Sequence, residues 1–450
     1  MSAVVHTTAR ADAQPLSIGP GDRILAFEGG QSHSLDRFLA HVRGLAEVLP
    51  PGRHAVNLCD DRYCFLVAFC AVALRGQVTL LPSSRAPVVV TDVLDQYEDS
   101  YTLGDVPLSL LPPRYWQMPH VLPELDGPVP MILDASVVAI GFTSGSTGAP
   151  TPNCKTWAGF RASTAQNLAA LHDLWPAGAL PSVVATVPPQ HMYGMELSVL
   201  LPLIGPAAVH AARPFFPEDV ARVLGEIPEP RLLATTPVHL RALVQSGVAL
   251  PPLCGIVSAT APLSMDLALA AESRFACEVR EMFGSTETRI IARRRPAIDS
   301  AWTPLPGVRV QPRPDGALVH AAHLPVPVVL ADLVEVEDDG RFHLRGRQAD
   351  LLEIAGKRAS LGDLTRRLLA IPGVVDGVML QLDAGQGRAV GRVAALVVAP
   401  MLDEATILAA LSESVDRVFL PRPLKKVEAL PRSEAGKLPR AELLGLLHGL

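Results

Sequence analysis

A short segment rich in hydroxyl and glycine residues is the part of the sequence best suited to chemistry. An apolar run, residues 137–142, leads into the six residues Thr143, Ser144, Gly145, Ser146, Thr147 and Gly148. Hydroxyl and backbone N–H groups can surround a polyphosphate, and glycine lets the backbone approach it closely. The segment lacks the Gly-Lys-Ser/Thr of a Walker A loop and does not match a Gly-x-Ser-x-Gly nucleophile elbow. It therefore predicts either a phosphate-binding loop or a simple connector.

Four later segments contain acidic, aromatic and basic residues that could complete a nucleotide site. They are EMFGSTE at residues 281–287, ADL at 331–333, GRQAD at 346–350 followed by GKR at 356–358, and LPRSEAGK at 430–437. Each also has an ordinary explanation: Glu287 could begin a helix, Asp332 could lie in a turn, and Lys437 could be a solvated charge. The informative feature is that all five segments occur together and in order.

The five segments resemble, in order, the signature motifs of the adenylate-forming superfamily. This superfamily contains acyl- and aryl-CoA synthetases, luciferases and the adenylation domains of peptide synthetases. The resemblance covers nearly the whole chain, with a shortened N-terminal portion. It implies an ATP- and Mg²⁺-dependent ligase that converts a carboxylic acid into an acyl-adenylate and transfers the acyl group to a thiol. The thiol would belong to coenzyme A or to the phosphopantetheine of an acyl carrier protein.

The resemblance also implies roles for individual residues. Thr286 would contact the α-phosphate, and Glu287 would hold Mg²⁺, a cation that prefers oxygen ligands. Lys437 would bridge the ribose side and the reacting carboxylate, and His191 would gate entry of the acid. A carboxylate needs no general base at pH 7, so catalysis must position two anions and neutralise growing charge. The implied nucleotide-binding set is residues 143–148 for the phosphates, Ala261, Pro262 and Phe283 for adenine, and Asp332 with Arg347 for the ribose.

Three positions depart from the family pattern. Thr151 stands where relatives often have lysine, with Lys155 the nearest lysine, and Ala349 replaces a hinge residue that is commonly Asp or Lys. Arg289 stands where a glycine often follows Thr-Glu-Thr, and it is expected to narrow the acyl pocket or to alter the thiol tunnel. Thr151 and Ala349 are the features that favour the alternative of a non-catalytic nucleotide-binding homologue. A second alternative is a ligase that loads a carrier protein directly, without free coenzyme A.

The nature of the acid is indicated only by resemblance. Tyr193 and its neighbours after His191 would form a binding slot that contains one polar group. Such a slot would suit a flat aryl acid or a medium acyl chain. The short N-terminus and residues 150–157 and 302–307 are similar to the acid-activating enzymes of aryl-polyene-type pigment clusters, which favours a hydroxyaryl acid in secondary metabolism. The arginines at 293–295 would either meet phosphates of the thiol substrate or form a solvated surface.

The composition excludes several other classes of protein. The chain has 450 residues, of which 49% are hydrophobic and 19% charged, with a net charge of −6. High hydrophobicity with low charge excludes a disordered chain, and the absence of concentrated basic residues argues against nucleic-acid binding. The longest apolar run, residues 64–74, is shorter than the roughly 20 residues of a membrane span. The six cysteines form no Cys-x-x-Cys pair, so reduced thiols in a cytoplasmic protein are expected.

The order of elements predicts an α/β fold. A helix is expected over residues 32–49, a strand over 55–59, a buried helix over 64–74 and a strand over 77–81, which is typical of an open α/β sheet. After residue 310, short strands separated by Asp-Gly pairs predict hairpins. The predicted organisation is a large N-terminal α/β domain, residues 1–346, and a small mobile α+β lid domain, residues 347–450.

Overall fold

A computed structural model describes residues 12–106, 111–144, 150–347, 351–354, 357–382, 392–432 and 438–448. Its contacts divide the chain into two compact units. Unit 1 comprises residues 1–300, 304–308 and 321–326, and unit 2 comprises residues 301–303, 309–320 and 327–450. Strands after residue 308 thus belong with the C-terminal part, and the predicted start of a mobile lid at residue 347 stays a prediction.

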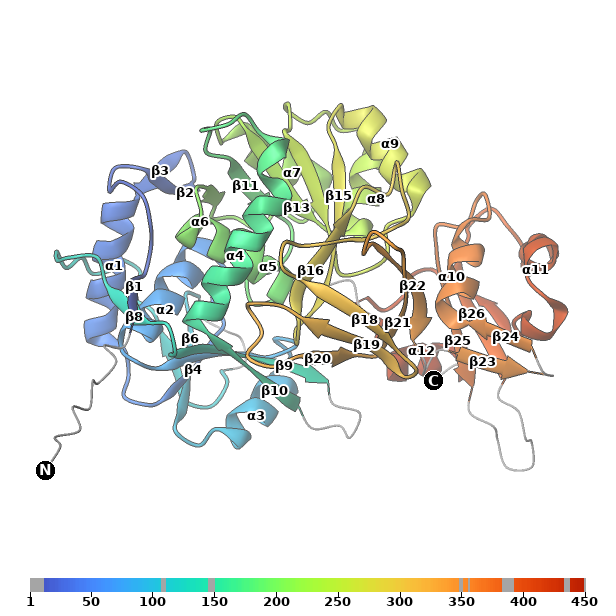
Figure 1. Ribbon diagram of the computed structural model, residues 1–450, viewed down its shortest axis with the longest axis horizontal. Coiled ribbons are helices and arrows are strands. Elements are labelled where there is room, and N and C mark those ends of the chain that lie inside the picture. Colours follow the sequence, from blue (N-terminus) through green and yellow to red (C-terminus); the bar gives the residue numbers. More distant parts are fainter. Residues whose placement is uncertain are drawn as a thin grey trace, which may run out of the picture. The chain divides into compact units, whose positions relative to one another are not determined.

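The larger sheet of unit 1 has a parallel centre (Figure 1). Its neighbouring strands run β16 (Arg289–Arg294), β15 (Val279–Ser285), β14 (Gly255–Ser258), β13 (Arg231–Thr235), β11 (Ser182–Ala185), β12 (Ala208–His210), β2 (Ile24–Glu28) and β3 (Gln31–Ser34). Strands β15 through β2 pair in parallel, whereas β16 and β3 are antiparallel to their neighbours. All parallel strands therefore end at the same edge of the sheet.

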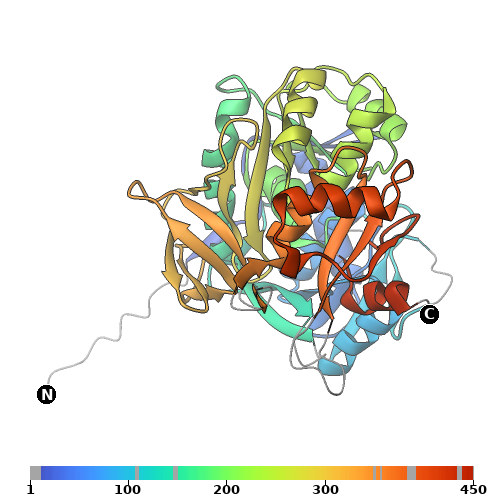
Figure 2. The same ribbon diagram turned by 90° about the vertical axis from the view of Figure 1, so that its right-hand side faces the viewer.

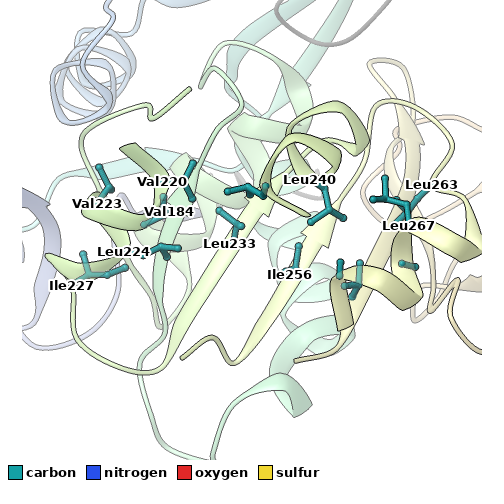
Figure 3. Packing of buried hydrophobic residues seen from close by; sticks show 14 residues of the cluster. Val184, Val220, Val223, Leu224, Ile227, Leu233, Leu240, Ile256, Leu263 and Leu267 are labelled. Atoms are coloured by element: carbon teal, nitrogen blue, oxygen red, sulfur yellow. The ribbon is translucent and has the colours of Figure 1, made fainter. Parts of the chain in front are cut away.

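Three amphipathic helices bury the apolar side chains on one part of this sheet. They are α7 (Pro217–Gly225), α8 (Pro237–Ser246) and α9 (Met265–Phe275). Figure 3 shows Leu224 and Leu240 from two of these helices packed with Val184, Leu233 and Ile256 of three adjacent strands. All five side chains are fully or almost fully inaccessible to solvent, so the strands are held rigidly along this core.

The second sheet of unit 1 carries the hydroxyl-rich segment. Its order is β10 (Pro150–Thr156), β9 (Val137–Ser144), β5 (Val78–Leu81), β4 (His54–Asn57), β6 (Ser100–Gly104) and β7 (Tyr115–Gln117). Further elements are the strand pair β1 (Ala13–Pro15) and β8 (Met131–Leu133), and the helices α1 (Leu35–Val48), α3 (Pro87–Gln96) and α4 (Trp157–Leu171).

Helix α2 (Arg62–Leu74) is buried on all sides, as its continuous apolar sequence predicted. Its first residue, Arg62, is fully buried and donates to Ala185 O at 2.9 Å and Val187 O at 3.0 Å at the end of β11. The helix therefore connects the second sheet to the end of a central strand of the larger one. Among the described residues, no helix has the length and apolar character required to cross a bilayer.

Unit 2 contains small sheets with helices packed on them (Figure 2); their strands pair antiparallel except β26 and β27, which run in parallel. The strands are β18 (Arg309–Arg313), β19 (Gly316–His320), β20 (Val328–Leu330), β21 (Asp332–Val336), β22 (Phe342–Arg347), β23 (Leu351–Ile354), β24 (Lys357–Ser360), β25 (Asp376–Leu382), β26 (Arg392–Val398) and β27 (Leu424–Lys426). Helices α10 (Leu361–Leu369) and α11 (Glu404–Ser414) share one core with the β25–β26–β27 sheet, and α12 (Arg440–His448) joins a second core with the alternate residues of β26. The hairpins predicted at both Asp-Gly turns are confirmed.

One predicted element was assigned incorrectly at its start. Residues 32–34 belong to β3, and the helix begins only at Leu35. Ser34 is its N-cap, because the Ser34 side chain accepts a hydrogen bond from Arg37 N. The six cysteines are free thiols, as expected.

Candidate active site

Several of the predicted site residues lie where the parallel strands of the larger sheet end. His191 follows β11, Thr260 follows β14, and Phe283 lies near the end of β15. Ligands of open α/β sheets bind at this edge. Three buried atoms here, Gln190 Oε1, Ser258 Oγ and Thr260 Oγ1, have no hydrogen-bond partner among the described residues. Buried polar atoms are normally paired, so this edge has hydrogen-bonding capacity for a polar ligand.

Backbone strain marks the same edge. Thr260 has φ +80°, a left-handed conformation that is unfavourable for a β-branched residue. The strained residue is followed by Ala261 and Pro262, which are respectively half-buried and exposed. Strain of this kind is stored most often at ligand sites. The family resemblance predicts Ala261 and Pro262 as neighbours of adenine, and no motif in the sequence points to Thr260.

A compact turn presents Thr286 and Glu287. Ser285 N donates to Thr288 Oγ1 at 3.1 Å, and Thr288 N donates to Ser285 Oγ at 3.1 Å. These reciprocal bonds close the turn between β15 and β16, and they leave the side chains of Thr286 and Glu287 half-buried. The turn therefore holds one hydroxyl and one carboxylate at the edge of the sheet.

The two strands that flank the hydroxyl-rich loop both contact this turn. A Cβ atom on Gly141 of β9 would lie 2.9 Å from Thr286 Cγ2 and 3.3 Å from Met192 Cε, so any larger residue would force the Thr286 side chain to shift. On β10, the Lys155 side chain donates from Nζ to Thr286 O at 2.5 Å and to Glu287 O at 3.2 Å. Within unit 1, the strands around the loop, the Thr286–Glu287 turn and the residue after His191 are thus brought together.

Lys155 is a site residue that sequence reasoning missed. Its side chain is 2% exposed, and burial lowers its pKa to about 8. Lys155 is close in sequence to the position where relatives often have a lysine. Its ammonium group, however, binds main-chain carbonyls. Thr151, at the position itself, is exposed and pairs with Thr143 in the β9–β10 ladder.

The Tyr193 hydroxyl, which was predicted as the polar group of the acid-binding slot, forms a hydrogen bond within the protein. Tyr193 is 5% exposed, and its hydroxyl donates to Val257 O at 2.8 Å. The prediction that Tyr193 offers its hydroxyl to the acid is therefore wrong, because the strand carbonyl already accepts it. His191 is half-buried at the start of α5 (Met192–Met195), which continues into a π-helical turn, η2 (Glu196–Leu200), and α6 (Leu201–Ile204).

Two of the three arginines at positions 293–295 form ion pairs with buried or half-buried carboxylates. Arg294 Nε donates to Glu281 Oε2 at 2.6 Å, and Glu281 Oε1 accepts from Leu263 N at 2.8 Å. Arg295 pairs with Glu272 at 2.8 Å. Arg294 thus fixes the loop after β14 that carries Ala261 and Pro262, and two of the three arginines have a structural role.

Unit 2 contains the remaining predicted residues. Asp332 and Arg347 are direct neighbours in the ladder between β21 and β22, so the backbone brings these two together. The side chains of Ser144 and Arg347 lie outside the described residues. So do residues Gly145, Ser146, Thr147, Gly148, Ala349 and Lys437 in full.

The described side chains could hold Mg²⁺ only together with phosphate oxygens of ATP. In the described ranges, no group of three or more His, Cys, Asp or Glu residues is arranged so that it could hold a metal ion. Glu287 offers a half-buried carboxylate in the turn. Mg²⁺ is commonly held by one or two carboxylates together with substrate phosphates, so this arrangement is compatible with it.

Comparison with known proteins identifies the family of this chain. The model of the AMP-binding enzyme family matches residues 24–347. A 4-coumarate--CoA ligase of Halorhodospira halophila is 29% identical over 68% of this chain and 77% of its own length. A sulfoacetate--CoA ligase of Cupriavidus necator is 26% identical over 76% of this chain and 73% of its own.

Solved structures share the fold over almost the full length. The o-succinylbenzoate CoA synthetase of Bacillus subtilis, solved with its acyl-adenylate intermediate, has a TM-score of 0.78 and 17% identity over 94% of this chain and 95% of that one. ATP-bound MatB of Rhodopseudomonas palustris has a TM-score of 0.76 and 18% identity over 95% of this chain and 96% of that one. The chain therefore belongs to the AMP-binding enzyme family, and it is an AMP-forming acid–thiol ligase of the acyl- and aryl-CoA synthetase type.

Proposed function

We propose that the protein activates a carboxylic acid with ATP and transfers the acyl group to coenzyme A. The observation that carries the proposal is the meeting of β9 and β10 with the Thr286–Glu287 turn. The loop between these strands and the turn would then face the same phosphates. Relatives named as CoA ligases support coenzyme A as the acceptor.

The first step is a displacement at phosphorus. An oxygen of the acid carboxylate forms a bond to the α-phosphorus of ATP, and the bond to pyrophosphate breaks, which gives an acyl-adenylate. In the second step the thiol sulfur attacks the acyl carbon, AMP leaves, and a thioester is formed. Neither step requires a protein nucleophile, so the side chains act by positioning and by stabilising charge.

Individual residues would contribute through the groups they present. Thr286 would donate its hydroxyl to the α-phosphate, and Glu287 would hold Mg²⁺, which would neutralise phosphate charge. Residues 143–148 would cradle the phosphates, and Phe283 with Ala261 and Pro262 would enclose adenine. Asp332 and Arg347 would bind the ribose, and His191 would guide the acid. Lys437, on a mobile lid, would bridge the nucleotide and the carboxylate during the first step.

Acid-dependent exchange of pyrophosphate into ATP tests the first half of the proposal. A panel of aryl and alkyl acids should include at least one that supports exchange, with a requirement for Mg²⁺. Thioester formation is then measured with coenzyme A and, separately, with a pantetheinylated carrier protein. Exchange followed by transfer to the carrier alone would reject coenzyme A as acceptor, and absence of exchange with every acid would reject the proposed function. A cytoplasmic location, where ATP and coenzyme A are available, follows from the proposal.

A further inference from the structure

The main-chain carbonyls of the Thr286–Glu287 turn are bound by side chains from two other parts of the chain. Lys155 Nζ donates to Thr286 O and Glu287 O. The next carbonyl oxygen along the chain, Thr288 O, lies 2.7 Å from Nε2 of His323. A main-chain carbonyl only accepts hydrogen bonds, so His323 Nε2 is the donor in this contact. His323 is 1% exposed, and the activity described so far gives it no role.

His323 belongs to a loop that is distant in sequence from the turn. Residues 321–326 lie between β19 and β20. The two strands belong to unit 2, whereas residues 321–326 belong to unit 1, as Thr288 does. The hydrogen bond between His323 and Thr288 O therefore lies within one compact unit, although the two residues are 35 positions apart.

Helix α4 fixes the other side of the imidazole ring. Gln166 Oε1 lies 2.5 Å from His323 Nδ1, and Gln166 Nε2 donates to Pro306 O at 2.8 Å. A Cβ atom on Gly159 would lie 3.0 Å from His323 O, so the loop backbone also runs close to the helix. Gly159 and Gln166 are seven residues apart and therefore lie on the same face of α4. The helix thus locates the ring at Nδ1 and leaves Nε2 to bind the turn.

Thr288 closes the turn, so the bond to its carbonyl restrains the turn as a whole. The Thr288 hydroxyl accepts from Ser285 N at 3.1 Å and donates to Arg289 O at 3.0 Å. Arg289 has φ +60°, and such backbone strain persists only where the surrounding structure fixes it. The Arg289 guanidinium packs on α4, with Cζ 4.9 Å from the centroid of the Phe160 ring. The bond from His323 is a second restraint, applied directly before the strained residue.

We propose that His323 is a positioning residue of the ligase, which holds the turn through Thr288 O so that Thr286 and Glu287 face the nucleotide. His323 touches no substrate and moves no proton in either step. Its contribution is geometric, because a displacement of about 1 Å near the reacting groups lowers the rate by about 100-fold. The inference rests on the proposed function, which assigns phosphate and Mg²⁺ binding to this turn.

Two amide substitutions separate the two nitrogens of the ring. In His323→Gln the amide nitrogen can take the place of Nε2 and still donate to Thr288 O. In His323→Asn the amide reaches only the place of Nδ1, so the contact with Gln166 is kept and the bond to Thr288 O is lost. We expect kcat for acid-dependent pyrophosphate exchange to stay within about threefold of the wild type in His323→Gln and to fall about 30-fold in His323→Asn. The KM for the acid should change less than kcat.

Hydrogen exchange of the backbone amides, followed by mass spectrometry, measures the restraint on the turn without the reaction. Residues 284–290 should exchange faster in His323→Asn than in His323→Gln or the wild type. The central strands β13 and β14 of the same sheet should exchange at unchanged rates. Gln166→Leu keeps His323 but removes the contact at Nδ1, so it should change kcat and the exchange of the turn in the same direction by less. It provides the test if His323→Asn fails to fold.

His41 provides matched control substitutions. It is a buried histidine of α1 whose ring nitrogens both have partners, with Nδ1 2.7 Å from Tyr63 Oη and Nε2 3.1 Å from Glu124 Oε1. His41→Gln and His41→Asn should lower the temperature of thermal unfolding but leave kcat and the hydrogen exchange of residues 284–290 close to those of the wild type.

The outcomes distinguish positioning from a purely structural role. Equal losses of kcat in His323→Gln and His323→Asn, or unchanged hydrogen exchange of the turn in His323→Asn, would overturn the inference. Full turnover in Gln166→Leu with unchanged exchange of the turn would also count against it. Failure of the wild type with every acid would reject the proposed function, and the hydrogen exchange of the turn would still decide whether His323 holds it.

Discussion

Replacing Lys155 by methionine tests whether the protein interior positions the Thr286–Glu287 turn. Methionine retains most of the aliphatic length but removes the bonds to Thr286 O and Glu287 O. We expect the acid-dependent exchange rate to fall by about 100-fold, because a shift of about 1 Å in a reacting group has an effect of that size. The loss should appear in kcat more than in KM for the acid.

The free energy of unfolding should change much less than this loss suggests. Each hydrogen bond from the ammonium contributes about 1.5–3 kcal/mol. Against this, lowering the pKa from 10.5 to about 8 means that burial of the charge costs about 3 kcal/mol at neutral pH. The two contributions largely cancel, so we expect Lys155→Met to be destabilised by no more than about 3 kcal/mol.

The pH dependence of stability gives an independent check. Between pH 8 and 10.5 the folded state loses the Lys155 proton before the unfolded state does. The unfolded state then binds more protons, so this residue makes the wild type more stable as the pH rises through that window. In the methionine variant this contribution should be missing. Denaturant unfolding at pH 7.5 and pH 10 measures the difference.

Arg43→Met is the matched control for Lys155→Met. Arg43 also donates to two main-chain carbonyls of unit 1, Leu125 O at 2.7 Å and Pro128 O at 3.0 Å, but on the exposed surface. The acid-dependent exchange rate of Arg43→Met should stay within about twofold of the wild-type rate. If Lys155→Met kept full exchange activity while losing stability, the lysine would have a purely structural role and the reasoning would be refuted.

Three further changes test other parts of the site. Glu287→Gln should raise the Mg²⁺ concentration for half-maximal exchange and lower turnover at least tenfold, and an unchanged Mg²⁺ titration would remove Glu287 from the metal site. Lys437→Ala should reduce acyl-adenylate formation far more than thioester formation from supplied acyl-adenylate, and equal losses in single-turnover assays would contradict its proposed role. Gly141→Ala should lower exchange by about tenfold because its Cβ would press on Thr286, whereas Gly225→Ala, whose Cβ meets no atom within 4 Å, should not. An equal effect of the two alanines would disprove the close packing of β9 on the turn.

Local sequence was sufficient for the elements with strong patterns. The continuous apolar character of α2 predicted a buried helix, and the Asp-Gly pairs predicted the hairpins of unit 2. The start of α1 was placed too early, because Ser32 and His33 continue the alternating pattern of a strand that only its pairing with β2 reveals. Tyr193 was misjudged because the sequence does not show that a strand carbonyl lies within reach of its hydroxyl.

By itself, the sequence determined the family and the type of reaction, since the order and local types of the motif residues are properties of the linear chain. Only the tertiary structure shows which groups Lys155 binds. They are two main-chain carbonyls more than 130 residues away in the sequence. Backbone carbonyls carry no residue-specific signal, and burial of a charge depends on how separate elements pack. These contacts therefore follow from packing in three dimensions and not from spacing along the chain.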